Sequence, residues 1–123
     1  MHLRVARHTE RIDELVAFYR DGLGLELSGT FAGHDGYSGV FLAIPGTGAH
    51  LEFTSGSSST VSVPHPESLL IFYLDDPAKV AATVERTGVT PINAENPYWE
   101  RIGAVTLRDP DGFLVVLVPT PWT

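Results

Sequence analysis

The stretch Phe18-Tyr19-Arg20-Asp21-Gly22-Leu23-Gly24-Leu25-Glu26-Leu27 marks the point where a predicted helix ends and a predicted strand begins. Before it, apolar residues recur at the i, i+3, i+4 and i+7 spacing of one helix face: Ile12, Leu15, Val16 and Tyr19. Gly22 and Gly24 supply the backbone freedom with which a helix ends and the chain turns back. The alternation in Leu25-Glu26-Leu27 then indicates a half-buried strand.

Further elements can be assigned on both sides of this stretch. Apolar and polar residues alternate over residues 2–6, which predicts a first strand. We expect Thr9 to cap the helix, because its hydroxyl can accept a hydrogen bond from the first turn. Glycine-rich turns separate three further predicted strands, at residues 25–30, 37–44 and 49–54. The first half of the chain therefore has the order βαβββ.

The same order recurs after a serine-rich linker at residues 55–67. Asp76 and Pro77 are typical of a helix start, and Gly88 is typical of a helix end. Strands are predicted before and after this helix, at residues 69–74, 89–92, 101–108 and 113–118. The second half is therefore also predicted to be βαβββ.

The two halves can be superimposed with a period of about 64 residues, so that Glu52 corresponds to Val116. One half alone cannot bury both faces of its sheet. We therefore predict one α+β domain of two βαβββ modules, which form a cupped mixed sheet with the helices outside. The predicted parts are the first module (1–54), the linker (55–67), the second module (68–119) and a tail (120–123).

Composition limits the function. The chain has 123 residues, 43% of them hydrophobic and 19% charged, as expected for one globular domain. Its formal net charge of −7 leaves no basic stripe for nucleic acid. The absence of cysteine excludes disulfides, thiolate catalysis and cysteine-ligated metals. No signal sequence or membrane-spanning run is recognisable, so we expect a cytoplasmic protein without a membrane partner.

Three segments stand in order within the repeat: AFYRDGLGLEL at 17–27, LLIFYLDD at 69–76 and DPDGFLVVLV at 109–118. On these segments the chain resembles the vicinal oxygen chelate superfamily of glyoxalases, bleomycin-resistance proteins and extradiol dioxygenases. The resemblance covers nearly the whole chain. It implies paired modules around a cupped sheet, a homodimer and, in the enzymes, a divalent metal held by up to four side chains.

The resemblance places the four metal-ligand positions on Arg4, Glu52, Leu69 and Val116. Only Glu52 has a side chain suited to a metal ion, because leucine and valine have no donor atom and arginine stays a cation. We therefore expect no cofactor. The alternative is a divalent metal at a displaced site built from Glu52, His50 and His2.

Strand alternation predicts which side chains face the cup. If Glu52 faces inward, His50 does too, whereas Tyr73 belongs to an apolar half. A partly polar, mostly apolar wall is typical of a small-molecule pocket. We expect Arg4 to pair with Glu52, either as a structural plug or as a clamp for an anionic ligand.

Two adjacent aromatic residues, Tyr98 and Trp99, lie in a segment interrupted by proline. They either cover the cup or pack at a dimer seam. The predicted ligand-binding residues are Arg4, His50, Glu52, Tyr73, Tyr98 and Trp99. No catalytic residue is assigned, because no nucleophile motif is present.

Three functions are compatible with the sequence. The first is a metal-free protein that binds a small, partly apolar organic molecule, similar to the bleomycin-resistance proteins. The second is a glyoxalase- or dioxygenase-like enzyme with a reduced or displaced metal site on Glu52. The third is a non-enzymatic dimeric module with a filled cup. We favour the first, because three of the four metal-ligand positions lack a suitable side chain.

Overall fold

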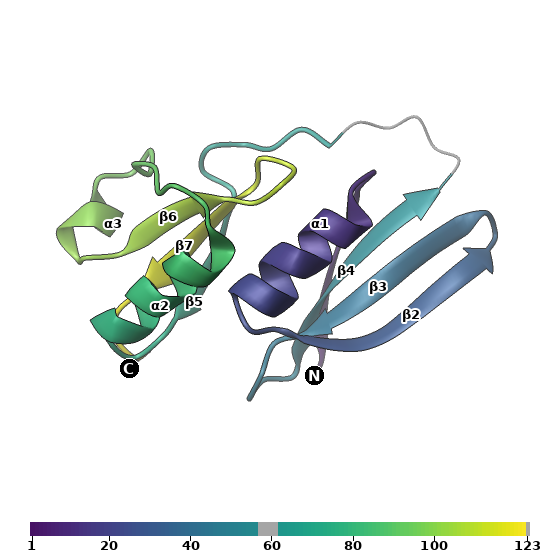
Figure 1. The fold of residues 1–123 in the computed structure, drawn as a ribbon, viewed down its shortest axis with the longest axis horizontal. Coiled ribbons are helices and arrows are strands. Elements are labelled where there is room, and N and C mark those ends of the chain that lie inside the picture. Colours follow the sequence, from purple (N-terminus) through teal and green to yellow (C-terminus); the bar gives the residue numbers. More distant parts are fainter. Residues whose placement is uncertain (57–61, 123) are drawn as a thin grey trace. The chain divides into compact units, whose positions relative to one another are not determined.

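A computed structural model describes residues 1–56 and 62–122 of the chain, so the serine-rich centre of the predicted linker lies outside the described residues. The chain divides into two compact units, Met1–Val63 and Pro64–Thr123. Each unit contains one sheet and its own helices (Figure 1), and each is described by itself. Among the described residues, no helix is long and apolar enough to cross a membrane.

The first unit has the predicted order of a strand, a helix and three strands. Its sheet has the strand order β1-β4-β3-β2, in which β1 and β4 are parallel and the other neighbours are antiparallel. The elements are β1 (Leu3–His8), α1 (Ile12–Val16), η1 (Ala17–Gly22), β2 (Glu26–His34), β3 (Tyr37–Ala43) and β4 (Ala49–Gly56). The prediction of βαβββ for the first half is confirmed.

The helix of the first unit changes type in the stretch around Phe18. The α-helix α1 continues directly into the π-helix η1, and Leu23 N donates a hydrogen bond to Phe18 O across the wider π turn. Gly24 then takes a positive φ of 85°, which favours glycine, and the chain turns into β2. The predicted Thr9 cap is wrong: the residue before α1 is Arg11, and the Thr9 hydroxyl accepts from Arg11 N instead.

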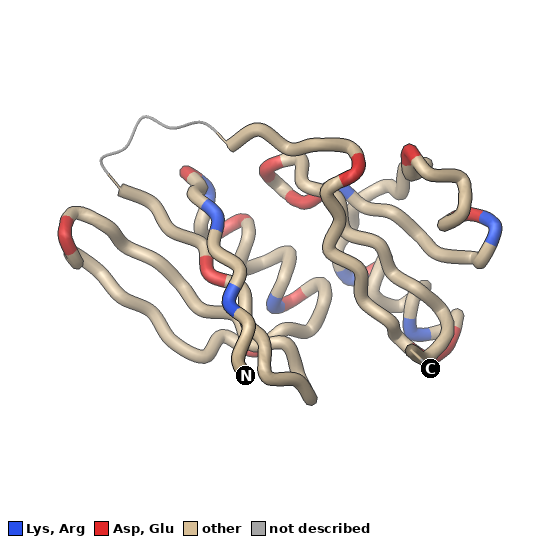
Figure 2. Tube along the Cα trace, turned by 180° about the vertical axis from the view of Figure 1, so that it is seen from behind, with Lys and Arg blue, Asp and Glu red and all other residues tan. Residues whose placement is uncertain are grey.

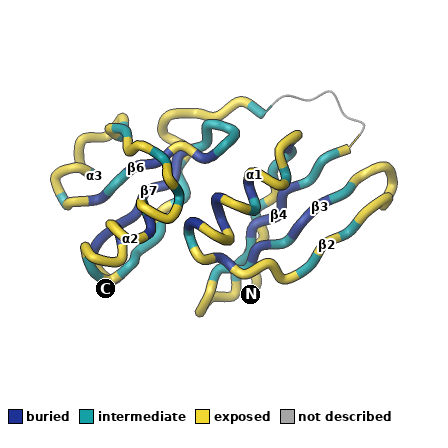
Figure 3. The backbone as a smooth tube through the Cα atoms, in the orientation of Figure 1, coloured by how far each residue is buried: buried dark blue, intermediate teal, exposed yellow. Residues whose placement is uncertain are grey.

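Helix α1 and η1 cover one face of this sheet. Leu15, Phe18 and Tyr19 are buried there, and the Tyr19 ring lies 5.1 Å from the Phe53 ring of β4. Figure 3 shows buried residues along α1 and the central strands, while the hairpin between β2 and β3 is exposed. The apolar helix face predicted from the sequence thus forms the core of the first unit.

The second unit repeats the arrangement with fewer strands. Its sheet has the order β5-β7-β6, with β5 parallel to β7 and β6 antiparallel to it. The elements are β5 (Leu69–Tyr73), α2 (Pro77–Thr87), α3 (Tyr98–Arg101), β6 (Val105–Arg108) and β7 (Leu114–Val118). In both units the first strand therefore runs parallel to the last, which confirms the predicted duplication of an α+β fold.

Two predicted strands of the second unit differ in the structure. The strand predicted at residues 89–92 is reduced to a single bridge between Ile92 and Thr106. The strand predicted at 101–108 begins only at Val105, because α3 ends at Arg101 and Gly103 follows with a φ of 80°. A positive φ does not continue a strand, so the alternating sequence here was a misleading signal.

The predicted ends of α2 are confirmed. Asp76 Oδ1 accepts a hydrogen bond of 2.8 Å from Lys79 N, and Pro77 occupies the first turn. Gly88 ends the helix in the left-handed conformation with a φ of 68°. Both helix ends are therefore set by local residue chemistry.

Acidic residues outnumber basic ones. The sequence has 8 Lys and Arg against 15 Asp and Glu. In Figure 2 the basic positions of the described residues are scattered along both units among acidic ones.

Candidate functional site

The candidate site lies on the face of the first sheet that is turned away from α1. Arg4 on β1 pairs in register with His50 on β4, and Phe41 on β3 pairs with Glu52. Paired residues of neighbouring strands share a face, and alternation places residues 50 and 52 together. The predicted residues Arg4, His50 and Glu52 are therefore brought together, and Phe41 joins them.

An ion pair connects the two charged members of this group. Arg4 Nε lies 3.0 Å from Glu52 Oε1; the Arg4 side chain is 58% exposed and the Glu52 side chain 8%. Oε1 is buried and accepts no well-directed hydrogen bond from the described residues, so the contact with Arg4 is mainly electrostatic. The exposed guanidinium thus compensates a buried carboxylate.

Histidine and phenylalanine rings continue the site along the sheet. His2 Nε2 and His50 Nδ1 are 2.7 Å apart and share a hydrogen bond, whose donor depends on the tautomers. The Phe41 ring meets the His50 ring edge to face, with 5.5 Å between centroids. The Phe31 ring centroid also lies 5.5 Å from that of Phe41, with the two ring planes tilted by 30°. The result is a row of rings beside the ion pair.

These residues surround a hollow of about 290 Å³. Its lining residues are His2, Arg4, Ser28, Phe41 and His50. Ser28 Oγ donates only a long hydrogen bond of 3.4 Å, to Phe41 O. Sequence reasoning did not find Ser28 and Phe41, because their position beside Arg4 depends on the pairing of β2 with β3. That pairing contains a register shift between Leu27 and Gly29.

The aromatic residues predicted for the site belong to the second unit. Trp99 and Tyr73 pack, together with Leu69 and Ile102, against a buried cluster of Ala104, Val116 and Val118. Tyr98 is 44% exposed, and its ring centroid lies 5.1 Å from that of Trp99. Trp122, in the C-terminal tail, contacts Tyr73 at 5.3 Å. Trp99 therefore covers apolar sheet residues of its own unit.

Comparison with known proteins places the chain in a family. Residues 3–54 match the YycE-like N-terminal domain, and residues 67–119 match the YycE-like C-terminal domain. The chain is 42% identical over 120 residues to the uncharacterized protein YycE of Bacillus subtilis, which covers 94% of this chain and 86% of that protein. The chain belongs to the YycE-like family.

Solved structures show which other proteins share the fold of this chain. The crystal structure of a YycE protein of unknown function from Bacillus subtilis has a TM-score of 0.90 at 40% identity, covering 99% of this chain and 91% of that one. A trypanothione-dependent glyoxalase I from Leishmania major has a TM-score of 0.71 at 21% identity, covering 98% and 86%. TnmS3, an antibiotic binding protein from Streptomyces sp. CB03234, also has 0.71 at 21%, covering 98% and 96%.

These comparisons confirm the predicted superfamily. The YycE-like chain has the fold of the vicinal oxygen chelate superfamily, with two small mixed sheets and a few helices. At 21% identity the glyoxalase and the antibiotic binding protein share this fold with it, and nothing finer follows from that likeness. The function of the YycE-like chain must therefore be argued from its own residues.

The residues at the four positions where the resemblance predicts metal ligands do not fit a divalent metal in this YycE-like chain. Glu52, the one suitable side chain, is tied to the cationic Arg4. Leu69 packs on the apolar cluster of the second unit, and Val116 is a fully buried member of it. In the part of the chain that the structure describes, no group of three His, Asp or Glu side chains could hold a metal ion.

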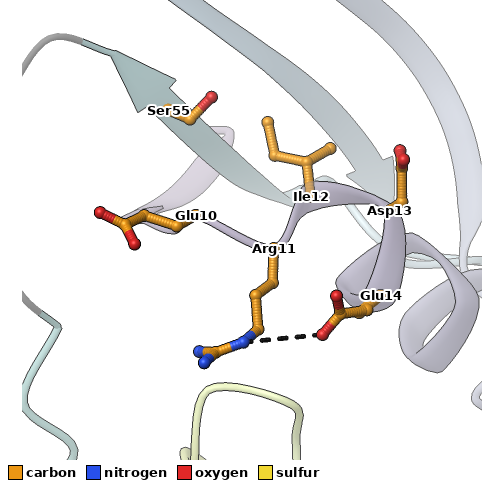
Figure 4. Close-up of a pocket in the computed structure, with 6 residues that line it drawn as sticks. All are labelled: Glu10, Arg11, Ile12, Asp13, Glu14 and Ser55. Atoms are coloured by element: carbon orange, nitrogen blue, oxygen red, sulfur yellow. Dashed lines mark ion pairs between the residues drawn. The ribbon is translucent and has the colours of Figure 1, made fainter.

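Two further hollows in the YycE-like chain contain none of the predicted site residues. One, of about 250 Å³, lies at the start of α1 (Figure 4) and is lined by Glu10, Arg11, Ile12, Asp13, Glu14 and Ser55. Its carboxylates point in different directions, and Glu14 pairs with Arg11 at 3.6 Å. The other is an apolar groove of about 470 Å³ beside α2 in the second unit. Neither groups polar side chains around one ligand position.

Proposed function

We propose that this YycE-like protein binds a small, partly apolar organic molecule in the hollow of its first unit, without a catalytic metal. The observation that carries the proposal is the Arg4–Glu52 ion pair, which joins two residues at positions where the resemblance predicts metal ligands. A carboxylate held by a guanidinium is not available to a metal ion. An exposed guanidinium, in contrast, is suited to bind an anionic group of an organic ligand.

The character of the hollow supports this proposal. Small-molecule sites are concave and combine aromatic walls with a few directing polar groups. The hollow combines Phe41 and two histidine rings with Arg4 and the Ser28 hydroxyl. A protein of the same fold, TnmS3, is described as an antibiotic binding protein. We extend that description to this chain as a proposal: its ligand would be an organic molecule with an aromatic part.

A second candidate function is an enzyme with a displaced metal site. The observation in its favour is the 2.7 Å separation of His2 Nε2 and His50 Nδ1, since two imidazole nitrogens are common metal ligands. In this reading the two nitrogens would exchange their hydrogen bond for a metal ion, with Glu52 as the third ligand. The nearby Arg4 guanidinium opposes such a cation, so we rank this function second.

Other predicted properties remain part of the proposal. We propose that the protein is a cytoplasmic homodimer. Tyr73, Tyr98 and Trp99 belong to the second unit and are not part of the proposed binding site. Trp99 packs on the apolar cluster of the second unit, which includes Val116. For this unit alone, the packing favours the third function, in which the protein's own side chains fill the apolar half of the cup. It leaves the hollow of the first unit as the proposed binding site.

Chemical-shift mapping tests the proposed function. ¹⁵N-labelled full-length protein would be titrated with a panel of aromatic and peptide-like antibiotics, both neutral and charged. We expect at least one member to move the amide signals of the lining residues: His2, Arg4, Ser28, Phe41 and His50. Shifts confined to the apolar groove beside α2, or none with any member of the panel, would contradict the proposal.

A further inference from the structure

We propose that the hollow of the first unit selects a planar aromatic ring that carries one carboxylate. In this proposal Arg4 binds the carboxylate, and the ring lies against Phe41 and His50. The inference rests on the proposed function, because it names the chemical class of the ligand for the same hollow. It adds a sign of charge and a shape, each of which can be tested separately.

The sign of the charge follows from which partner of the ion pair is accessible. The Glu52 side chain is 8% exposed, whereas the Arg4 side chain is 58% exposed. Nε of Arg4 makes the 3.0 Å contact with Glu52, and the terminal guanidinium nitrogens make no hydrogen bond to any described residue. A guanidinium with two accessible N–H groups binds a carboxylate through two parallel hydrogen bonds. The exposed positive charge of Arg4 in the hollow is therefore available to bind an anion.

Glu52 acts as a positioning residue for this contact. It lies diagonally across from Arg4, and its pull on Nε holds the guanidinium over the sheet. An arginine held in this way loses less side-chain freedom when it binds a ligand. A second donor is near, because Ser28 Oγ makes only a long 3.4 Å hydrogen bond to Phe41 O and can turn toward the ligand's carboxylate.

The planar shape follows from the rings that line the hollow. Phe41 lies edge to face with His50, and Phe31 makes a tilted contact with Phe41 at 30°, each at 5.5 Å between centroids. A flat ring can join such a row through the same edge and face contacts, which a saturated ring cannot make. The two histidines, hydrogen-bonded to each other, close the row at its far end.

The volume of the hollow limits the ligand to a small molecule, because about 290 Å³ lies at the lower limit of ordinary ligand pockets. The net charge of −7 does not attract anions from a distance, so affinity must come from local contact. We therefore expect a minimal probe to bind with a Kd of about 1 mM.

Three probes on the unmodified full-length chain separate charge from shape. Benzoate has both features, benzamide lacks the charge, and cyclohexanecarboxylate lacks the planar ring. In ¹H–¹⁵N titrations we expect benzoate to move the Arg4 Nε–Hε signal together with the lining amides. Benzamide should bind about tenfold more weakly, since it loses the charge-assisted hydrogen bonds. Cyclohexanecarboxylate should bind about threefold more weakly.

Variants test the role of Arg4. Arg4→Ala should weaken benzoate binding about tenfold, and Arg4→Lys should restore only part of the loss, because an ammonium cannot form the two parallel bonds. Arg20→Ala is the matched control: Arg20 is also half exposed and pairs with a carboxylate, Asp21, at 2.9 Å, but it lies outside the hollow. It should leave benzoate binding unchanged.

The outcomes are distinct for the two proposals. Equal binding of benzamide and benzoate, or unchanged binding by Arg4→Ala, overturns the inference. If benzoate fails to bind while a neutral antibiotic shifts the same lining residues, the inference fails and the proposed function stands. If neither shifts them, both fail. Should Arg4→Ala not fold, the comparison of probes on the unmodified chain and the Arg4→Lys variant still decide.

Discussion

Arg4 of β1 and Glu52 of β4 pair diagonally, with Nε 3.0 Å from Oε1, although the residue in register with Arg4 is His50. Ala6 is the residue in register with Glu52. The parallel pairing of β1 with β4 thus brings together two of the residues at which the resemblance to the superfamily predicts metal ligands.

Substitutions of Arg4 and Glu52 should have non-additive effects on the free energy of unfolding. Arg4→Ala leaves the buried Glu52 carboxylate without its cation, so we expect a loss of about 1–2 kcal/mol, reduced because Arg4 is half exposed. Arg4→Ala combined with Glu52→Ala should cost less than the sum of the single changes. Urea denaturation of the four proteins in this double-mutant cycle gives the coupling energy.

The Arg20–Asp21 pair is the control for that cycle. Both of its side chains are about half exposed, so its coupling should be close to zero. Strict additivity of the Arg4 and Glu52 changes, together with equal stability of Arg4→Ala and the unmodified protein, would show that Arg4 does not compensate Glu52.

The two tryptophans should contribute unequally to stability. Trp99 packs on the buried cluster that includes Val116, so Trp99→Ala removes a large core contact and should cost about 2–3 kcal/mol. Trp122 is 78% exposed, and Trp122→Ala should change the free energy of unfolding by less than about 0.5 kcal/mol. Denaturation followed by circular dichroism compares the two. Equal effects would argue against Trp99 as a cover for this sheet.

Helix α2 should depend on its N-cap. Asp76→Ala removes the 2.8 Å hydrogen bond to Lys79 N and should cost about 1 kcal/mol. The neighbouring Asp75 has a φ of 73°, so Asp75→Asn is the appropriate control, because asparagine tolerates this conformation. Thermal unfolding should show a lower Tm only for Asp76→Ala. An equal decrease in both variants would contradict the assignment of the cap.

The Asp21 carboxyl should titrate below its ordinary range. Its hydrogen bond from Arg20 lowers its pKa, and the two charges add to the effect. A lowered pKa in the folded state stabilises the protein above the unfolded-state pKa, and this contribution is lost as the pH falls through the folded-state pKa. Because both groups are exposed, the contribution is small. NMR titration should show the Asp21 pKa rising in Arg20→Ala; an unchanged pKa would contradict this cause.

Local chemistry made much of the fold predictable. The α2 boundaries follow from Asp76, Pro77 and Gly88, and the strands of the first unit follow from alternation. The strand prediction failed where a short helix and a turn replaced a segment with alternating residues. Residues 101–104 alternate like a strand, but the short helix α3 and the positive φ of Gly103 take up this segment.

The site was predictable only in part for a similar reason. Alternation along a single strand is enough to place His50 and Glu52 on one face, and the resemblance to the superfamily adds Arg4, which the structure pairs with His50. Ser28 and Phe41 could not be placed, because a bulge in β2 decides which residues lie beside them. The clustering of Trp99 with Val116 depends on how α3 folds back over the sheet, which no local pattern specifies.

Metal analysis of the purified protein tests whether this protein is metal-free, as we propose. The protein would be measured for bound metal and then melted with added Zn²⁺, Ni²⁺, Mn²⁺ or Fe²⁺, since an ion that binds the folded state raises Tm. We expect no stoichiometric metal and no rise in Tm, because Arg4 is paired with Glu52, the only suitable carboxylate at the predicted metal-ligand positions. Stoichiometric metal that is lost in Glu52→Ala would contradict it.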